Sequence, residues 1–147
     1  MISNVMRTPT EIAEELRPIL VRTARELRRE TETLGVTTRQ ATLLWRVRSS
    51  PGLSLRELAA AEGISAPALS DHVDRLEALG FVARVRSNAD RRRVGLELTQ
   101  AGEALLRRVR SRRTTWLTTR LAALGPDEIA AIALALPALQ RLIEVDA

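Results

Sequence analysis

Apolar residues near the N-terminus recur every three or four positions, which is the period of an amphipathic helix. The stripe runs through residues 10–34 and stops at Gly35, while Pro18 within it predicts a kink or a local break. Near the other end, residues 127–145 are apolar on most sides, and such a helix must be buried. In a chain this small the simplest burial is against a second copy, so both segments predict a homodimer.

Three shorter helices are predicted between residues 37 and 80, each preceded by a capping residue. Thr37 and Gln40 have the spacing of a capping box, and Ser54 and Glu57 repeat that spacing before the second of these helices. Ser65 is expected to cap the third helix. The buried stripe of that helix is predicted to consist of Leu69, Val73, Leu76 and Leu79.

Beyond this helix the period of the pattern changes to two, which is typical of strands. In the first half of the segment, Ala83 and Val85 alternate with Arg84 and Arg86. The second half alternates in the same way after a polar stretch, so residues 81–98 predict a two-stranded β-ribbon with a basic loop at its tip.

The predicted fold is mainly α with a small β element, of the α+β class. A short helix, a tight turn, a second helix and a β-hairpin make a winged helix-turn-helix over residues 37–98. Long helices within residues 10–34 and 103–145 flank this region and are expected to join two chains. We expect the whole chain, residues 1–147, to be a single domain.

The basic residues of the chain are arginines only, and they are unevenly distributed. All 23 basic residues are Arg, and residues 84–113 carry ten of them against three acidic residues, a net charge of +7. An excess of this size indicates a polyanionic partner such as DNA or an acidic membrane surface. An arginine-rich solvated helix is the alternative interpretation.

The composition also excludes several classes of protein. Without lysine or cysteine there is no Schiff-base or P-loop lysine, no disulfide, no thiolate metal site and no cysteine nucleophile. With 2% aromatic residues, the chain lacks the rings for a single-strand stacking platform. The longest uncharged apolar run, residues 129–139, is too short to span a bilayer, and the N-terminus lacks a signal-peptide pattern. We therefore expect a cytoplasmic protein that is not in a membrane.

The helix capped by Ser65 is expected to enter the major groove of DNA, which has room for one α-helix. With the apolar stripe facing inward, a step of 100° per residue directs Asp71 and Arg75 outward. Arg91 and Arg92 at the ribbon tip can reach an adjacent minor groove, and for each arginine the alternative is a solvated surface charge. The candidate DNA-binding residues are Arg39, Arg56, Ser65, Ala66, Pro67, Ala68, Ser70, Asp71, Arg75, Arg84, Arg86, Asp90, Arg91 and Arg92.

Asp90 is an anion among the cations of the ribbon tip. We interpret its carboxylate as an acceptor that orients an arginine side chain by a charge-assisted hydrogen bond before that side chain enters DNA. Arg84 and Arg86 project from one face of the neighbouring strand and could share the same carboxylate.

Five segments, taken in order, resemble the MarR family of dimeric bacterial transcriptional regulators. They are VTTRQ (36–40), LAAAEGIS (58–65), DRLEALGFV (74–82), DRR (90–92) and LTQAG (98–102). The resemblance implies a homodimer joined by the terminal helices and bound to pseudo-palindromic operators. It also implies release of DNA when a small phenolic or anionic compound enters a cleft between the dimerisation and DNA-binding regions. By match to the family motif, Arg92 is the first choice for the main basic contact and Arg91 the second.

The sequence departs from the family in two respects. Members often carry a basic residue where this chain has Asp71. The peroxide-sensing branch depends on a reactive cysteine that this chain lacks, and a single His72 does not fit the ligand set of zinc-sensing members. We therefore expect no metal and no cofactor.

Two other functions are alternatives to a ligand-gated repressor. Ser70, Asp71 and His72 are the residue types of a hydrolase triad, but neighbours on a helix point about 100° apart and cannot form the relay. No enzyme activity or catalytic residue is therefore expected. The remaining alternative is a constitutive or partner-controlled DNA-binding protein without an effector. If an effector binds, Trp45 and Trp116 are the aromatic residues that could face it, with plain core packing as the alternative.

Overall fold

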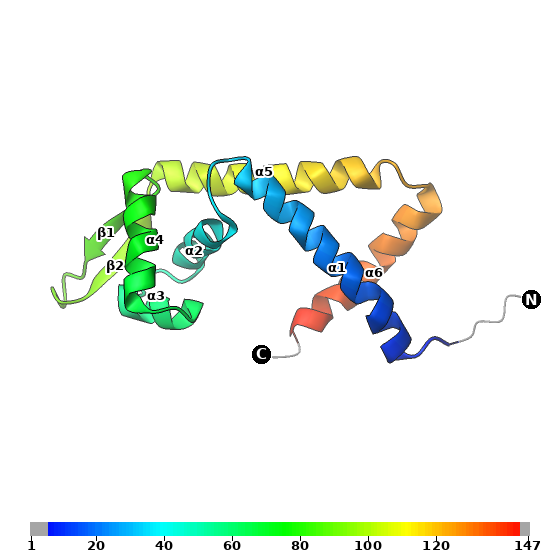
Figure 1. The fold of residues 1–147 in the computed structure, drawn as a ribbon, viewed down its shortest axis with the longest axis horizontal. Helices are drawn as coiled ribbons and strands as arrows, with labels where there is room; N and C mark the ends of the chain where they lie inside the picture. The colour runs from blue at the N-terminus through cyan, green and yellow to red at the C-terminus, as the bar shows by residue number, and fades with distance from the viewer. Residues whose placement is uncertain (1–5, 145–147) are drawn as a thin grey trace, which may run out of the picture. The chain divides into compact units, whose positions relative to one another are not determined.

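Most of the helices begin after a residue whose side chain accepts a free N–H group of the first helical turn. The computed structural model describes residues 6–144, and Figure 1 shows the arrangement of the elements. The predicted end of the last helix at Val145 lies outside the described residues. The elements are α1 (Pro9–Glu32), α2 (Thr38–Ser49), α3 (Leu55–Glu62), α4 (Ala66–Ala78), β1 (Val82–Arg86), β2 (Val94–Leu98), α5 (Gln100–Leu121) and α6 (Pro126–Glu144).

The two predicted capping boxes are confirmed. The Gln40 backbone N–H donates to the Thr37 hydroxyl at 3.1 Å, while the Gln40 side chain accepts from the Thr37 N–H at 3.0 Å. Ser54 and Glu57 make the same reciprocal pair at 3.2 and 2.8 Å. These local bonds fix where α2 and α3 begin, and a third box, at the start of α1, was not predicted.

Of the kink or break predicted at Pro18, the break does not occur, because α1 continues through this residue for 24 residues in all. A proline inside a helix removes one backbone hydrogen bond, and the residues on both sides of Pro18 keep their helical pattern. Leu79 was also predicted to be buried, but it is 51% exposed. It is the C-cap of α4, and the chain turns at Gly80 with a φ of 79°, which carries Leu79 off the buried stripe.

The two strands form the predicted antiparallel ribbon, the wing, with Arg84 opposite Leu96 and Val82 opposite Leu98. The inward-facing residue of β1 is Val82, which is 2% exposed, whereas the predicted apolar positions Ala83 and Val85 are exposed. Arg84 shares the inner face with Val82, and carboxylates of α4 bind its guanidinium, so the alternation of apolar and basic residues does not identify the buried face of β1.

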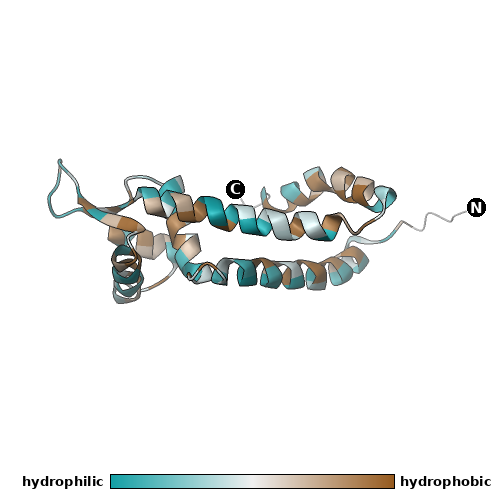
Figure 2. Cartoon of the chain, turned by 90° about the horizontal axis from the view of Figure 1, so that it is seen from above, coloured by the Kyte–Doolittle hydropathy of each residue, from teal (hydrophilic) through white to brown (hydrophobic). Residues whose placement is uncertain are grey.

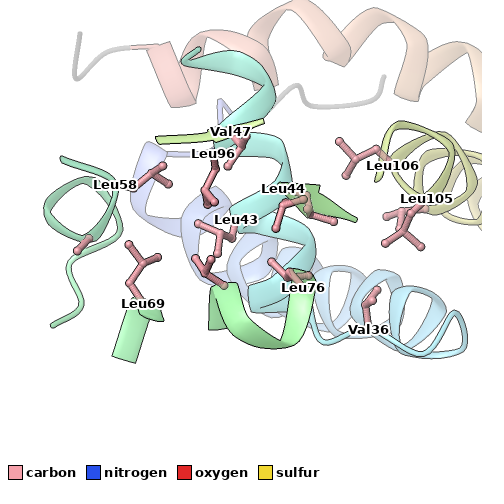
Figure 3. Close-up of a cluster of buried hydrophobic side chains, with 14 residues drawn as sticks. Val36, Leu43, Leu44, Val47, Leu58, Leu69, Leu76, Leu96, Leu105 and Leu106 are labelled. Carbon is pink, nitrogen blue, oxygen red and sulfur yellow. The ribbon is translucent and has the colours of Figure 1, made fainter. Parts of the chain in front are cut away.

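The core of the helix-turn-helix consists mainly of leucine and valine side chains (Figure 3). Most of them come from α2 and from five elements around it, namely α3, α4, α5, β1 and β2. At its edge, α5 follows the wing closely. A Cβ at Gly102 would lie 2.2 Å from the Phe81 carbonyl oxygen, so only glycine allows this approach. The largest fully buried side chains include Leu43, Leu44, Leu58, Leu69, Leu76, Leu105 and Leu106.

Contacts among the described residues group the chain into two parts, the first ending at Arg113 and the second beginning at Thr114, within α5. The second part consists of the end of α5 and all of α6. Apolar residues recur along α6 (Figure 2), yet α6 contains no buried residue. Its apolar side chains include Leu136, 56% exposed, and Ile143, 83% exposed. This helix therefore presents an apolar surface that the chain itself does not cover.

Candidate nucleic-acid interface

One face of α4 is free of protein contacts. The Ser65 hydroxyl accepts the Ala68 backbone N–H at 3.2 Å, which starts the helix, and Leu69, Val73 and Leu76 turn the other face into the core. Ala68 is half-buried, whereas the remaining candidates of this segment are exposed. These exposed residues are Ser65, Ala66, Pro67, Ser70, Asp71 and Arg75.

The loop that joins β1 to β2 is held by its own backbone. The Ser87 N–H donates to the Arg93 carbonyl at 3.0 Å, and the Arg93 N–H donates to the Asp90 carbonyl at 3.0 Å. Arg91 and Arg92 are exposed, and no carboxylate among residues 6–144 forms an ion pair with either. Their guanidinium groups are therefore free to bind an external anion, at the hydrophilic tip that Figure 2 shows.

Asp90 does not orient an arginine side chain, which corrects the expectation from the sequence. Its carboxylate accepts the backbone N–H of Arg92 at 3.0 Å, the geometry of an Asx turn. The carboxylate thus fixes the backbone of the tip and leaves the neighbouring guanidinium groups unpaired.

The Arg84 side chain binds carboxylates of α4 and not that of Asp90. Its guanidinium donates to Asp74 at 2.6 Å and to Glu77 at 2.7 Å, and its backbone N–H donates to Glu77 at 3.3 Å. The hydrogen bond to Asp74 raises the pKa of Arg84 despite the opposing effect of burial. Arg86, opposite Val94 on the same strand face, is exposed.

Arg93, which the sequence analysis did not single out, joins the wing to the start of α3. Its guanidinium donates to Glu57 at 2.6 Å and to the Gly52 carbonyl at 3.2 Å. The Ser54 backbone N–H and Arg93 together lower the pKa of the Glu57 carboxyl. Glu57 therefore serves both the capping box and the wing, a double role that its spacing from Ser54 does not reveal.

Two surface grooves lie beside helix starts and are lined by other candidate arginines. A groove of about 400 Å³ between the wing and α3 is lined by Arg56 and Arg92, with Asp90 and Arg93 beside them. A second groove of about 390 Å³ is lined by Arg39 at the start of α2 and by Glu62, whose carboxylate pairs with Arg46 at 2.9 Å. Helix starts and guanidinium groups without a carboxylate partner both favour phosphate, so Arg39, Arg56 and Arg92 remain the candidate phosphate contacts at these grooves.

The tryptophans predicted to face an effector lie in different parts of the chain, and each is half-buried. Trp45 packs against the core of the first part, with the Arg48 guanidinium 5.5 Å from its ring centroid. Trp116 belongs to the second part, where Arg120 lies 5.0 Å from its ring centroid. Their role in ligand binding remains a prediction.

Arg113 is a half-buried charge that the sequence analysis missed. Its Nε and Nη2 groups donate to the hydroxyl of the fully buried Thr31 at 2.9 and 2.7 Å. Burial lowers the pKa of Arg113, and no carboxylate of residues 6–113 forms an ion pair with it. A guanidinium has five N–H donors, so this group retains donors for an anion.

Within residues 6–144, no three His, Asp or Glu side chains come together as a metal site requires. Over the same residues, no helix combines the length and apolar character needed to cross a bilayer.

The chain is similar to known proteins in both sequence and fold. Residues 34–93 match the MarR family. The chain is 27% identical over 124 residues to an uncharacterised HTH-type transcriptional regulator of Mycobacterium leprae, covering 84% of this chain and 87% of that one. It is also similar to a transcriptional regulator from Thermotoga maritima, with a TM-score of 0.79, 26% identity, and coverage of 93% of this chain and 96% of that chain.

A MepR variant from S. aureus, bound to an oligodeoxyribonucleotide, has the same fold. Its TM-score is 0.72 at 21% identity, with 89% of this chain and 96% of that chain covered. The matched segment contains α2, α3, α4 and β1, and the similar structures extend over the flanking helices. Residues 34–93 thus match the MarR family, and the chain as a whole has the winged helix-turn-helix fold of the transcriptional regulators to which it is similar.

Proposed function

We propose that two copies of this chain bind a pseudo-palindromic DNA operator in the cytoplasm and repress transcription until a small anionic ligand binds. The observation that carries the DNA-binding step is the free face of α4 beside a wing whose Arg91 and Arg92 are unpaired. An α-helix reads the major groove, and arginines at a wing tip favour the narrow minor groove. The DNA-bound MepR variant, which has this fold, supports the same assignment.

The proposed homodimer rests on apolar surface that the single chain leaves uncovered. In α6, Ile132 is 39% and Leu136 56% exposed, and in α1 Ile19 is 59% exposed. Soluble monomers rarely leave such extended apolar surface in water. Two copies that bury these helices would also place two α4 helices on one DNA duplex, which suits a pseudo-palindromic site.

The proposed effector is an anion because Arg113 is a half-buried cation without a carboxylate partner in the first part of the chain. Removing a charge from water is costly unless an opposite charge accompanies it. An aromatic carboxylate would supply that charge. Such a ligand releases DNA only by binding one dimer shape more tightly than another, and tenfold release requires about 1.4 kcal/mol.

In-vitro selection with the full chain on random duplexes, followed by footprinting, tests the proposal. A protected site with two related half-sites supports dimeric operator binding, and no enrichment over an unselected duplex contradicts it. The footprint is then repeated with benzoate, salicylate and other aromatic acids. Loss of protection with one of them supports gating. Protection and tryptophan fluorescence that stay unchanged with all of them contradict gating and favour a constitutive DNA-binding protein.

A further inference from the structure

The helix expected to read DNA carries an excess of negative charge. Within α4, Asp71, Asp74 and Glu77 oppose the single cation Arg75, which leaves a net charge of −2 with His72 neutral. DNA is a dense polyanion, so unpaired carboxylates on this helix would weaken its approach. A cation that pairs with Asp74 and Glu77 would reduce this repulsion.

Arg84 of the wing meets both carboxylates. Its Nη2 lies 2.6 Å from Asp74 Oδ1 and its Nη1 lies 2.7 Å from Glu77 Oε1. The two terminal nitrogens of one guanidinium therefore bind two different carboxylates. Glu77 also accepts the Arg84 backbone N–H at 3.3 Å. Asp74 and Glu77 are three residues apart on α4 and therefore lie on one face of the helix.

The three side chains of this cluster differ in exposure. The side chain of Arg84 is 30% exposed, less than the 62% of Asp74 and the 42% of Glu77. Arg84 is thus the least exposed side chain of the three, and both ends of its guanidinium are already bound to carboxylates. To reach a phosphate it would have to leave two short charge-assisted bonds and expose both acids beside the DNA.

We propose that Arg84 is a positioning residue, which fixes the wing against α4 and neutralises Asp74 and Glu77, and that it makes no phosphate or base contact itself. This inference rests on the proposed DNA binding and assigns Arg84 a role within it. Arg84 joins the two DNA-reading elements, because β1 leads into the wing tip and α4 carries the groove-facing residues. The bridge therefore sets the spacing between the major-groove and minor-groove contacts before DNA arrives, which lowers the entropy lost on binding.

A mutant cycle separates positioning from direct contact. Arg84→Gln, the pair Asp74→Asn with Glu77→Gln, and the triple variant are compared with the wild-type chain on the duplex that the wild-type chain selects. If Arg84 acts through the two acids, Arg84→Gln alone weakens binding by about tenfold or more, and its effect shrinks to about twofold when the acids are neutral. If Arg84 contacts a phosphate, its replacement costs the same in both backgrounds, and that result would overturn the proposal.

Arg86→Gln is the matched control, since it removes the same charge from the same face of β1. Arg86 has no ion pair among residues 6–144, so its replacement should cost the same factor with or without the two acids. Thermal unfolding of every variant shows that the chain still folds. Hydrogen exchange of the wing amides gives a second readout that requires no DNA. Exchange should rise in Arg84→Gln and not in Arg86→Gln, and equal exchange in the two variants would also contradict the proposal.

The experiment distinguishes a failure of the proposed function from a failure of the role assigned to Arg84. A wild-type chain that enriches no duplex contradicts the proposed function, whatever the variants do. A wild-type chain that binds DNA, with an Arg84→Gln effect independent of the acids, retains the proposed function and removes only the role of Arg84.

Discussion

Arg93 at the edge of the wing donates to the carboxylate of Glu57 at 2.6 Å, which connects residues 36 positions apart. Glu57 accepts the Ser54 backbone N–H at 2.8 Å with the same carboxylate oxygen. The start of α3 and the wing thus depend on one side chain, and a change in the charge of Glu57 alters both.

This relationship predicts a pH dependence. The pKa of Glu57 is lowered from its ordinary value of 4.5, first by the Ser54 backbone N–H and then by Arg93. A carboxyl whose pKa is lower in the folded state stabilises the fold above its unfolded pKa, and the contribution is lost as the pH falls through the folded pKa. Glu57→Gln keeps the capping acceptor and removes the charge. Its melting temperature should therefore be lower than that of the wild type at pH 7 and approach it at pH 3. A constant difference across this range would contradict the assignment.

The second prediction concerns the wing tip. Arg92→Ala should leave folding and dimerisation intact, because exposed positions usually change stability by less than about 0.5 kcal/mol. Operator affinity should fall by about 1–3 kcal/mol, roughly fivefold to 150-fold. The slope of log K against log[salt] should become shallower by about 0.9 for each chain that loses a phosphate contact. Arg110→Ala in α5 is the control, since it removes the same charge from an exposed helix position outside the wing. Equal losses in both variants would mean that net charge alone matters.

The elements that sequence analysis predicted correctly are those fixed by nearby residues. The α2 and α3 starts follow from side chains three residues away, and the ribbon follows from alternation within a short segment. The partners of Arg84 and Arg93 could not be predicted, because they depend on how the ribbon folds back on α3 and α4. Asp90 illustrates the same limit, since its carboxylate can bind either a nearby backbone N–H or a side chain, and only the loop conformation decides.

The third prediction concerns assembly. The α6 residues Ile129, Ile132, Leu136, Leu139 and Ile143 recur every three or four positions and share one stripe, whereas Leu134 lies off it. Light scattering should give a dimer, with an interface above about 2,000 Å². Leu136→Glu should shift the chain towards monomer, because it places a charge in the stripe that the proposed dimer would bury. Leu134→Glu should not, although Leu134 is more exposed, at 82% against 56% for Leu136. A wild-type monomer at micromolar concentration would contradict the homodimer.

The fourth prediction concerns the effector. Arg113→Gln should abolish the response of the DNA complex to an aromatic acid. Without the acid, the DNA affinity should change by less than about twofold, because the Arg113 side chain donates to Thr31 within the protein. Arg112→Gln is the matched control. It removes the same charge at the neighbouring position of the helix, where the Arg112 guanidinium already lies 3.9 Å from a carboxylate oxygen of Glu30. Fluorescence-anisotropy titration of a labelled operator, with and without the acid, measures both quantities. A full response in Arg113→Gln would show that the anion binds elsewhere.

The last prediction separates charge from hydrogen bonding at Asp90. Simple charge counting predicts that removing this carboxylate tightens DNA binding, because an anion near the phosphates is lost. The structure favours a different result, since the carboxylate accepts the Arg92 backbone N–H at 3.0 Å and holds the loop that presents Arg91 and Arg92. Asp90→Ala should therefore weaken operator binding through loss of loop order, by about three- to tenfold for one lost hydrogen bond per wing. Asp90→Asn removes the same charge and retains a side-chain oxygen that can accept the same N–H. It should bind at least as tightly as the wild type in an anisotropy titration at fixed salt. Tighter binding by both variants would mean that Asp90 only repels DNA, and equal weakening by both would mean that the charge itself is needed at the tip.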